Sequence, residues 1–525
     1  MKHLRILSLL LLLSSLFFTA CKKDEANSGI SGTLTNSNGD ALAGVTVTVY
    51  DLDGAEIAST NSAADGTYSL EGTSNGSIEF VKLAYRSTEE TLNGDEEQTI
   101  NASLQDDAFV SSYFGTANNL IDSSTSIFQS NSILPASSVN FGTQAVVNNN
   151  WFVSTNFKGA VDPNSTAWYD GWSFYSRIVA GNTTSAALPS GRPSLTVNDG
   201  LLQNAADSIY WSNDTTYVLD GFVFVGEGQT LFIEKGTIIQ GKAGSGADAS
   251  ALIVARGGKL MAEGTAAEPI IFTFEGDQGG TAATERARWG GLIVLGKASL
   301  NSTPGETQIE GIPSSESRGL YGGTLDNDNS GVIRYVSIRH GGSNIGADNE
   351  INGLTLGGVG NGTTIEYVEI IGNKDDGIEW FGGTVDAKYL ISAFCADDAL
   401  DYDEGYRGRN QFVIVHQNEN PNDDADRGGE HDGGTNPETA TPYATPIFAN
   451  ATFVGNPNSR AITFRDNAGG QYYNSIFSGF DRGIDIEDLI GQEQDSYKQW
   501  QDGNLKIEGC FFHNINASNI FRTSN

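Results

Sequence analysis

Acidic side chains occupy matching positions in several short apolar segments of the C-terminal half of the chain. Aligned on their apolar residues, these segments place Glu379 beside Phe381, Asp401 beside Asp403, Glu430 beside Asp432, Thr463 beside Arg465, and Asp485 beside Glu487. Seven carboxylates and one arginine would then share one strip. Because carboxylates packed this closely repel one another, some of them bind protons or cations.

Oxygen ligands from several Asp and Glu side chains suit the hard cation Ca²⁺. We therefore predict a calcium site with ligands drawn from Asp401, Asp403, Glu430, Asp432, Asp485 and Glu487. The alternative is a solvated acidic face, which keeps exposed strands soluble and discourages pairing with other chains. No loop in this region has the spacing of an established calcium motif, so both interpretations stay open.

Regular spacing along the chain identifies the elements that would hold this strip. A separation of 22 residues relates Ile378 to Leu400, Ile462 to Ile484, and Tyr367 to Tyr389. A repeat of this length, made of short β-branched strands and glycine or asparagine turns, fits one coil of a parallel β-helix. Side chains alternate along a strand, so the carboxylates point outward if the aliphatic residues before them point inward. The segment 418–445 is interpreted as a long insertion into one coil, with Glu430 in its strand.

Similar coils occur further upstream. Apolar strands separated by glycine turns are found at residues 231–241, 251–260, 268–273 and 288–294. Together with the 22-residue repeat, they resemble the right-handed β-helix lipoproteins and secreted proteins of Bacteroidota. The resemblance implies an all-β protein with a right-handed parallel β-helix over residues 217–525, and it indicates little about activity.

Enzymes similar to pectate lyases and polygalacturonases share this solenoid and place their chemistry on the outer face of one sheet. A lyase here would use Ca²⁺ to acidify a C–H bond and Arg465, the one basic residue of the strip, to take the proton. A hydrolase would need two carboxylates about 5–9.5 Å apart, drawn from Asp401, Asp403, Glu430 or Asp432. The strings Asn-Thr-Asp, Gly-His-Gly and Arg-Ile-Lys that characterise those enzymes do not occur in the sequence. We therefore expect no catalysis, and we expect His431 to point inward as a packed side chain.

The N-terminal part shows a different pattern. Strands with apolar residues at every second position, such as Val45-Thr46-Val47, alternate with Asn-Gly and Asp-Gly turns, and they predict a small antiparallel β-sandwich over residues 30–105. Gly39, the strand 44–47 and Asp65-Gly66-Thr67-Tyr68 resemble the carboxypeptidase regulatory-like domain, which is a transthyretin-like sandwich. The expected role of this domain is that of a spacer.

Residues 106–216 form a linking or capping region that the sequence explains poorly. Aromatic residues cluster between Trp151 and Tyr175. Clustered rings can line a platform for a sugar, but more often they close the open end of a β-domain.

The first residues predict export and a lipid anchor. Lys2 and Arg5 precede an apolar run at 6–18, which is shorter than the roughly 20 residues that span a bilayer, so residues 1–20 are interpreted as a signal peptide. Phe18-Thr19-Ala20-Cys21 is similar to the lipobox of bacterial lipoproteins, which implies lipidation of Cys21 and a tether at 21–29. Lys22-Lys23-Asp24-Glu25 resembles the tract that sends Bacteroidota lipoproteins to the cell surface, which implies the outer membrane. The two other cysteines, Cys395 and Cys510, are expected to be buried thiols.

Charge limits the partners. Removal of the signal peptide changes the formal net charge from −35 to −37, because Lys2 and Arg5 are lost. Such a surface repels nucleic acid, which we exclude as a partner. We expect a non-catalytic surface protein whose acidic β-helix binds a polysaccharide, a cation-bridged polymer or a protein partner. A Ca²⁺-dependent polysaccharide lyase or glycosidase, and an accessory subunit of an outer-membrane transport or assembly complex, stay open as alternatives.

Overall fold

The computed structural model describes residues 27–113, 120–122 and 151–524, except 53–54, 74, 83–84, 95–96, 346–349, 435–436, 490–493 and 517–518. The expected signal peptide and Cys21 lie outside the described residues. The chain divides into two units, residues 1–82 with 87–105, and residues 83–86 with 106–525. Within the described ranges, no helix has the length and apolar character needed to cross a membrane.

The first unit is a β-sandwich of two four-stranded sheets. In one sheet β1 (Asn27–Asn36) pairs antiparallel with β4 (Thr67–Thr73) and parallel with β7 (Glu97–Thr99) and β8 (Ala102–Leu104). The other is antiparallel, in the order β3 (Glu56–Asn61), β2 (Thr46–Tyr50), β5 (Ser77–Val81) and β6 (Thr88–Thr91). Val47, Ile78 and Phe80 are buried. The predicted sandwich is confirmed, with the difference that β1 makes two parallel pairings.

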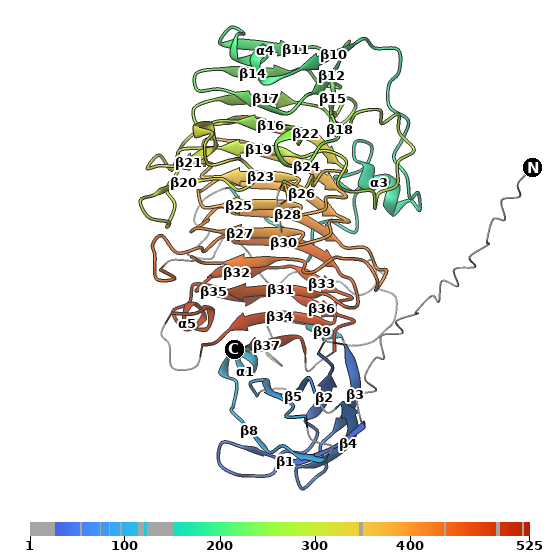
Figure 1. The fold of residues 1–525 in the computed structure, drawn as a ribbon, viewed down its shortest axis with the longest axis vertical. Helices are drawn as coiled ribbons and strands as arrows, with labels where there is room; N and C mark the ends of the chain where they lie inside the picture. Colours follow the sequence, from blue (N-terminus) through green and yellow to red (C-terminus); the bar gives the residue numbers. More distant parts are fainter. Residues whose placement is uncertain are drawn as a thin grey trace, which may run out of the picture. The chain divides into compact units, whose positions relative to one another are not determined.

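Parallel strands stacked coil upon coil form the second unit (Figure 1). One of its sheets has ten strands, in the order β13 (Phe222–Val225), β16 (Ala251–Val254), β19 (Leu292–Leu295), β23 (Leu354–Gly357), β25 (Ile378–Phe381), β27 (Leu400–Asp403), β29 (Glu430–Asp432), β31 (Arg460–Arg465), β34 (Arg482–Glu487) and β37 (Phe521–Ser524). Ile378 pairs with Leu400 and Ile462 with Ile484, which confirms the 22-residue coil.

A seventeen-stranded sheet completes the coils. Its order is β10 (Ser194–Val197), β11 (Ser208–Trp211), β12 (Thr216–Leu219), β14 (Thr230–Ile233), β15 (Ile238–Gly241), β17 (Lys259–Glu263), β18 (Ile270–Phe274), β22 (Gly331–Arg339), β24 (Thr364–Ile371), β26 (Ala387–Ala393), β28 (Arg409–His416), β30 (Ile447–Val454), β32 (Gly470–Tyr473), β33 (Ile476–Ser478), β35 (Leu505–Glu508), β36 (Phe511–His513) and β9 (Leu120–Asp122). Ser194 already pairs with Thr216, so the coils begin before residue 217, where the sequence analysis started them.

Three long strands of this sheet, β22, β24 and β26, each contain a tyrosine in the left-handed backbone conformation. Tyr335, Tyr367 and Tyr389 have φ of 49°, 55° and 61°. Their rings stack with 4.3 Å between successive centroids. Tyr335, Tyr367 and Tyr389 thus form a stack of rings, here called the tyrosine ladder, and the 22-residue spacing of Tyr367 and Tyr389 reflects it.

Short helices cover the first and last coils. At the first coils α4 (Asp199–Gln203) packs against β13. At the last coil α1 (Ala108–Tyr113) packs on β37, and Phe109 contacts Phe521 and Trp500 of α5 (Ser496–Gln501) edge to face. Residues 106–122 therefore do include a cap, as the sequence analysis allowed.

The aromatic cluster has a different position from either one expected. Trp168 and Trp172, which precede α3 (Phe174–Val179), contact Tyr389 and Tyr335 of the tyrosine ladder. Trp172 is buried. Trp168 and Trp172 thus cover the flank of the coils and do not close an end.

Candidate functional site

The acidic strip exists as a row of paired residues on the ten-stranded sheet. Adjacent strands pair Glu379 with Asp401, Asp401 with Glu430, Glu430 with Thr463, and Thr463 with Asp485. A second row pairs Phe381 with Asp403 and Asp432 with Arg465. The aliphatic residues that precede the first row are buried in the core. The register inferred from the sequence is therefore confirmed.

Part of the strip is buried. Glu379, Thr463 and Asp485 retain only 7%, 8% and 2% of their exposed surface. Asn352, which precedes β23, donates hydrogen bonds from Nδ2 to Glu379 Oε2 and, over 3.2 Å, to Glu310 Oε1. The interpretation as a solvated acidic face is therefore wrong for these residues.

Pairs of aspartates in the turns add to the strip. Asp375-Asp376 precedes β25, and Asp397-Asp398 precedes β27 in the next coil. The Asp398 N–H donates a 2.9 Å hydrogen bond to Asp376 Oδ1. Three sets of carboxylates each have oxygens within 4.8 Å of one another, namely Asp375 with Asp376 and Asp397, Asp376 with Glu379 and Asp401, and Asp397 with Asp398 and Asp426.

The set of Asp376, Glu379 and Asp401, here called the carboxylate triad, is the most enclosed of the three. Asp401 Oδ1 and the neighbouring Asn352 Oδ1 are buried, and neither accepts a hydrogen bond from any described residue. Burial, and then repulsion from neighbouring carboxylates, raises the pKa of all three triad groups well above the ordinary range. Three such groups close together must share protons or bind a cation.

Arginines neutralise the acids further along the strip. Arg465 donates hydrogen bonds of 2.7 and 2.9 Å to the two oxygens of Asp432 and lies 3.0 Å from Glu430. Arg427 lies 3.0 Å from Glu430 and 3.4 Å from Asp398. Among the described residues, no basic side chain forms an ion pair with the triad. The uncompensated charge is thus concentrated at the triad.

The six predicted calcium ligands do not form one group. Glu430 and Asp432 are paired with arginine, Asp485 accepts a 2.6 Å hydrogen bond from Ser524 Oγ, Glu487 accepts one of 3.0 Å from the Asp466 N–H, and Asp403 accepts one from the Glu404 N–H. Of the six, only Asp401 belongs to a described set of three close carboxylates. Asp376 was not among the predicted ligands, although its coil equivalent Asp398 follows 22 residues later.

The geometry of the triad fits Ca²⁺. Calcium–oxygen bonds are about 2.3–2.6 Å long, so two oxygens on one ion lie at most about 5 Å apart. The triad oxygens, within 4.8 Å of one another, meet this condition. The unpartnered Asn352 Oδ1 offers a fourth, neutral oxygen beside them. An all-oxygen set of this kind suits calcium rather than zinc.

Two of the side chains considered for catalysis, Arg465 and His431, are in states unsuited to proton transfer. The hydrogen bonds from Arg465 to Asp432 raise the pKa of the Arg465 guanidinium, so this group keeps its proton and cannot act as a base. His431 is fully buried and stacks on Tyr402 with 4.1 Å between centroids, and its Nε2 lies 2.7 Å from Tyr472 Oη. Burial lowers the pKa of His431 to about 3. Its predicted inward orientation is confirmed.

Stacked parallel coils with a carboxylate strip on one sheet define a protein of the parallel β-helix class. The chain belongs to the pectate-lyase-like β-helix domain family, whose model matches residues 203–524. Residues 29–105 match the carboxypeptidase regulatory-like domain, as the sequence predicted.

Other comparisons add little. No curated protein matches the chain. Among solved structures, BcpA, the major pilin subunit of Bacillus cereus, is 11% identical over 15% of this chain and 30% of the pilin chain, with a TM-score of 0.13. A likeness this weak carries no argument about fold or function.

Proposed function

We propose that this protein is a non-catalytic polysaccharide-binding protein whose β-helix holds Ca²⁺ at the carboxylate triad, and that a lipid on Cys21 anchors it in the outer membrane with the β-helix at the cell surface. The triad carries the proposal, because two buried carboxylates and a half-buried third, without a basic partner among the described residues, need a cation to stay ionised. The match to a pectate-lyase-like β-helix supports a polysaccharide as the ligand. The sequence around Cys21 supports the anchor.

The position of the triad favours a structural role for the ion. Asp376 and Glu379 are each only 7% exposed, and Asn352, which also contacts Glu310, donates a hydrogen bond to Glu379. A polymer therefore has little access to a cation bound there. An ion that binds only the folded state stabilises it by RT ln(1 + [Ca²⁺]/Kd), about 2.7 kcal/mol at a hundredfold excess over Kd.

Calorimetry with Ca²⁺ tests the cation site. The wild-type protein should bind Ca²⁺, and Asp376→Asn and Asp401→Asn should each lower the affinity at least tenfold. Asp424→Asn is the matched control, because Asp424 carries the same charge close by, with its side chain 71% exposed and Lys374 as its ion-pair partner. A flat titration of the wild type, or an equal loss in the control, contradicts the site.

Retention on immobilised polysaccharides, with analysis of the released sugars, tests the remaining part of the proposal. The protein should be retained by at least one acidic polysaccharide and should release no unsaturated or shortened sugars. Products that disappear in Asp401→Ala or Arg465→Ala would instead establish the lyase or glycosidase. Co-purification of a stable protein partner from native membranes, without polysaccharide retention, would favour the accessory-subunit alternative.

A further inference from the structure

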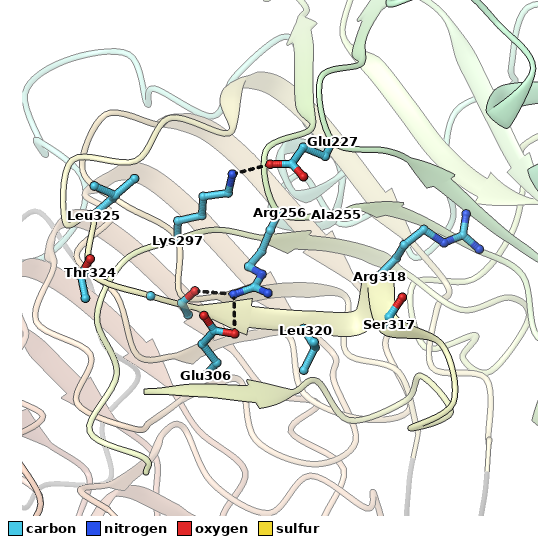
Figure 2. A pocket seen from close by; sticks show the side chains of 12 residues that line it. Glu227, Ala255, Arg256, Lys297, Glu306, Ser317, Arg318, Leu320, Thr324 and Leu325 are labelled. Atoms are coloured by element: carbon cyan, nitrogen blue, oxygen red, sulfur yellow. Dashed lines mark hydrogen bonds and ion pairs between the residues drawn. The ribbon is translucent and has the colours of Figure 1, made fainter. Parts of the chain in front are cut away.

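A cationic pocket lies on the ten-stranded sheet, in coils well before the triad. Its cavity measures about 520 Å³, within the range of roughly 300–1,000 Å³ found for small-molecule sites. Glu227, Arg256 and Lys297 line it, each two residues beyond the end of β13, β16 or β19. The other side is formed by the hairpin of β20 (Glu306–Gln308) and β21 (Leu320–Gly322) with the 3-10 turn η3 (Ser317–Gly319). Figure 2 shows these side chains around the hollow.

Three cationic side chains line the pocket, Arg256, Lys297 and Arg318, on a chain with a formal net charge of −35. Arg318 is fixed, because it lies 3.9 Å above the Phe224 ring, donates two 3.0 Å hydrogen bonds to Asp199 and pairs with Glu316. Arg256 donates from Nη1 to Gly322 O over 2.9 Å. The backbone thus holds the Arg256 side chain in place whatever its counter-ion does.

The counter-ions of Arg256 and Lys297 are exposed. Glu306 lies 3.1 Å from Arg256 Nη1 with its side chain 50% exposed, and Glu227 lies 2.8 Å from Lys297 Nζ with its side chain 74% exposed. Exposed ion pairs of this kind contribute only about 0–1 kcal/mol, so another anion can displace either carboxylate. Arg256 Nε and Nη2 have no hydrogen-bond partner among the described residues. One edge of the guanidinium is therefore free to take two oxygens of an anion through two hydrogen bonds.

We infer that this pocket binds the carboxylate or sulfate group of an acidic saccharide. The free edge of Arg256 takes the anion, Lys297 Nζ supplies the second positive charge, and Glu227 and Glu306 turn out to solvent. Ser317 and Thr324 offer hydroxyls, and Leu320 an apolar surface, to the rest of the sugar. The inference rests on the proposed function only in taking the ligand to be a saccharide.

Calorimetry on the full chain, with digalacturonate as the carboxylate probe and a sulfated disaccharide as the sulfate probe, tests the pocket. The methyl ester of digalacturonate has nearly the same shape without the charge and should bind at least tenfold more weakly. Arg256→Gln should reduce the affinity for the charged probe 10- to 100-fold, as expected for loss of a bidentate charged contact. The probe that binds more tightly identifies the anion.

A charge-matched pair of variants distinguishes binding in the pocket from a general effect of the protein's net charge. Glu306→Gln releases Arg256 and should raise the affinity two- to fivefold. Glu268→Gln makes the same charge change in an exposed pair with Lys235, elsewhere on the β-helix, and should leave the affinity unchanged. Equal effects of the two variants, wild-type affinity in Arg256→Gln, or no binding of either charged probe would overturn the inference.

Failure of the pocket and failure of the proposed function remain distinguishable. If polysaccharide retention persists in Arg256→Gln while Ca²⁺ affinity and melting temperature stay at wild-type values, the polysaccharide binds elsewhere on the protein. Loss of retention in that same folded, Ca²⁺-binding variant supports the pocket.

Discussion

Stabilisation by Ca²⁺ should increase with pH, and this prediction follows from the sign of the pKa shifts around the triad. Burial raises the pKa of Asp375 from 3.8 to about 7, and it raises those of Asp376, Glu379 and Asp401 well above their ordinary range. Between the unfolded and the folded pKa, the calcium-free folded state binds more protons than the unfolded state. Its stability therefore falls as the pH rises through this window. Ca²⁺ takes the place of the protons that neutralise these carboxylates, so the stabilisation of the folded state by Ca²⁺ is largest at high pH.

Asp375 gives the scale of the effect. A carboxyl whose pKa is about 7 instead of 3.8 costs the folded state on the order of 4 kcal/mol at pH 7, and solvent screening at this partly exposed group lowers the figure. Unfolding about 420 residues (106–525) changes the entropy by about 0.9 kcal/mol/K. One such group thus corresponds to a difference of up to about 4 °C in melting temperature between saturating Ca²⁺ and EDTA.

The difference between the two conditions is the quantity to measure, because buried histidines act in the opposite direction. Burial lowers the pKa of His340 and His416 to about 4 and that of His431 to about 3, so their contribution to stability rises with pH up to about 6.5. This contribution is the same with and without Ca²⁺ and cancels in the difference. Scanning calorimetry from pH 4.5 to 7.5 should show the increment growing by several degrees, and it should be lost in Asp376→Asn but kept in Asp424→Asn.

Proton release provides an independent measurement of the same linkage. Titration of Ca²⁺ at pH 6 in two buffers of different ionisation enthalpy should show about one proton or more released per ion bound. An increment that does not change with pH, together with binding that releases no proton, would refute the reasoning, because the triad would then be ionised without its cation.

Three further predictions concern other parts of the chain. His431→Phe should lower the free energy of unfolding by about 1–3 kcal/mol in urea titrations, because Tyr472 Oη loses its buried partner; an unchanged midpoint would contradict this. Cys395 and Cys510 are buried free thiols, so a thiol reagent should label neither in the native protein and both in guanidinium, and native labelling of either would argue against the packing described here. Cys21→Ser should shift the protein from the membrane to the soluble fraction and abolish acyl labelling, whereas continued membrane attachment would point to a different anchor.

The fold could be predicted well from the sequence because the strands of a β-helix recur at a regular spacing along the chain. Equivalent residues of successive coils lie over one another, so the pairing of Ile378 with Leu400 and the stacking of Tyr367 on Tyr389 follow from numbering alone once the 22-residue period is known. The residue at which the β-helix begins was harder to predict than the length of its coil. The strands β10 and β11 were missed because they are isolated four-residue segments, separated by α4 and turns, without the long aliphatic runs found downstream.

The site was predicted in register but not in environment. Strand alternation correctly placed Glu379 and Asp401 side by side on the outer face. It could not show that Asn352, at the coil position of Asp376, donates its amide to Glu379 and to Glu310, because Glu310 comes from a loop outside the repeat and its position depends on tertiary packing. The same limitation hid the cationic pocket, where Arg256 and Arg318 are separated by 62 residues in the chain and meet only through the β20–β21 hairpin.

The acidic region spans three successive coils, whose strands carry Glu379, Asp401 and Glu430, and the third coil differs from the other two because an arginine precedes its strand. Parallel pairing of Asp401 with Glu430 puts Arg427 at the position that Asp398 and Asp376 occupy in the preceding coils. Stacking brings equivalent residues of successive coils to about 4.8 Å, so repetition of an acidic turn places carboxylate on carboxylate. In the coil with Arg427, the strand acid Glu430 has its cation within the chain, 3.0 Å away. In the coils with aspartate at that position, Glu379 and Asp401 have no such partner among the described residues, and an external cation supplies the charge that arginine supplies one coil later.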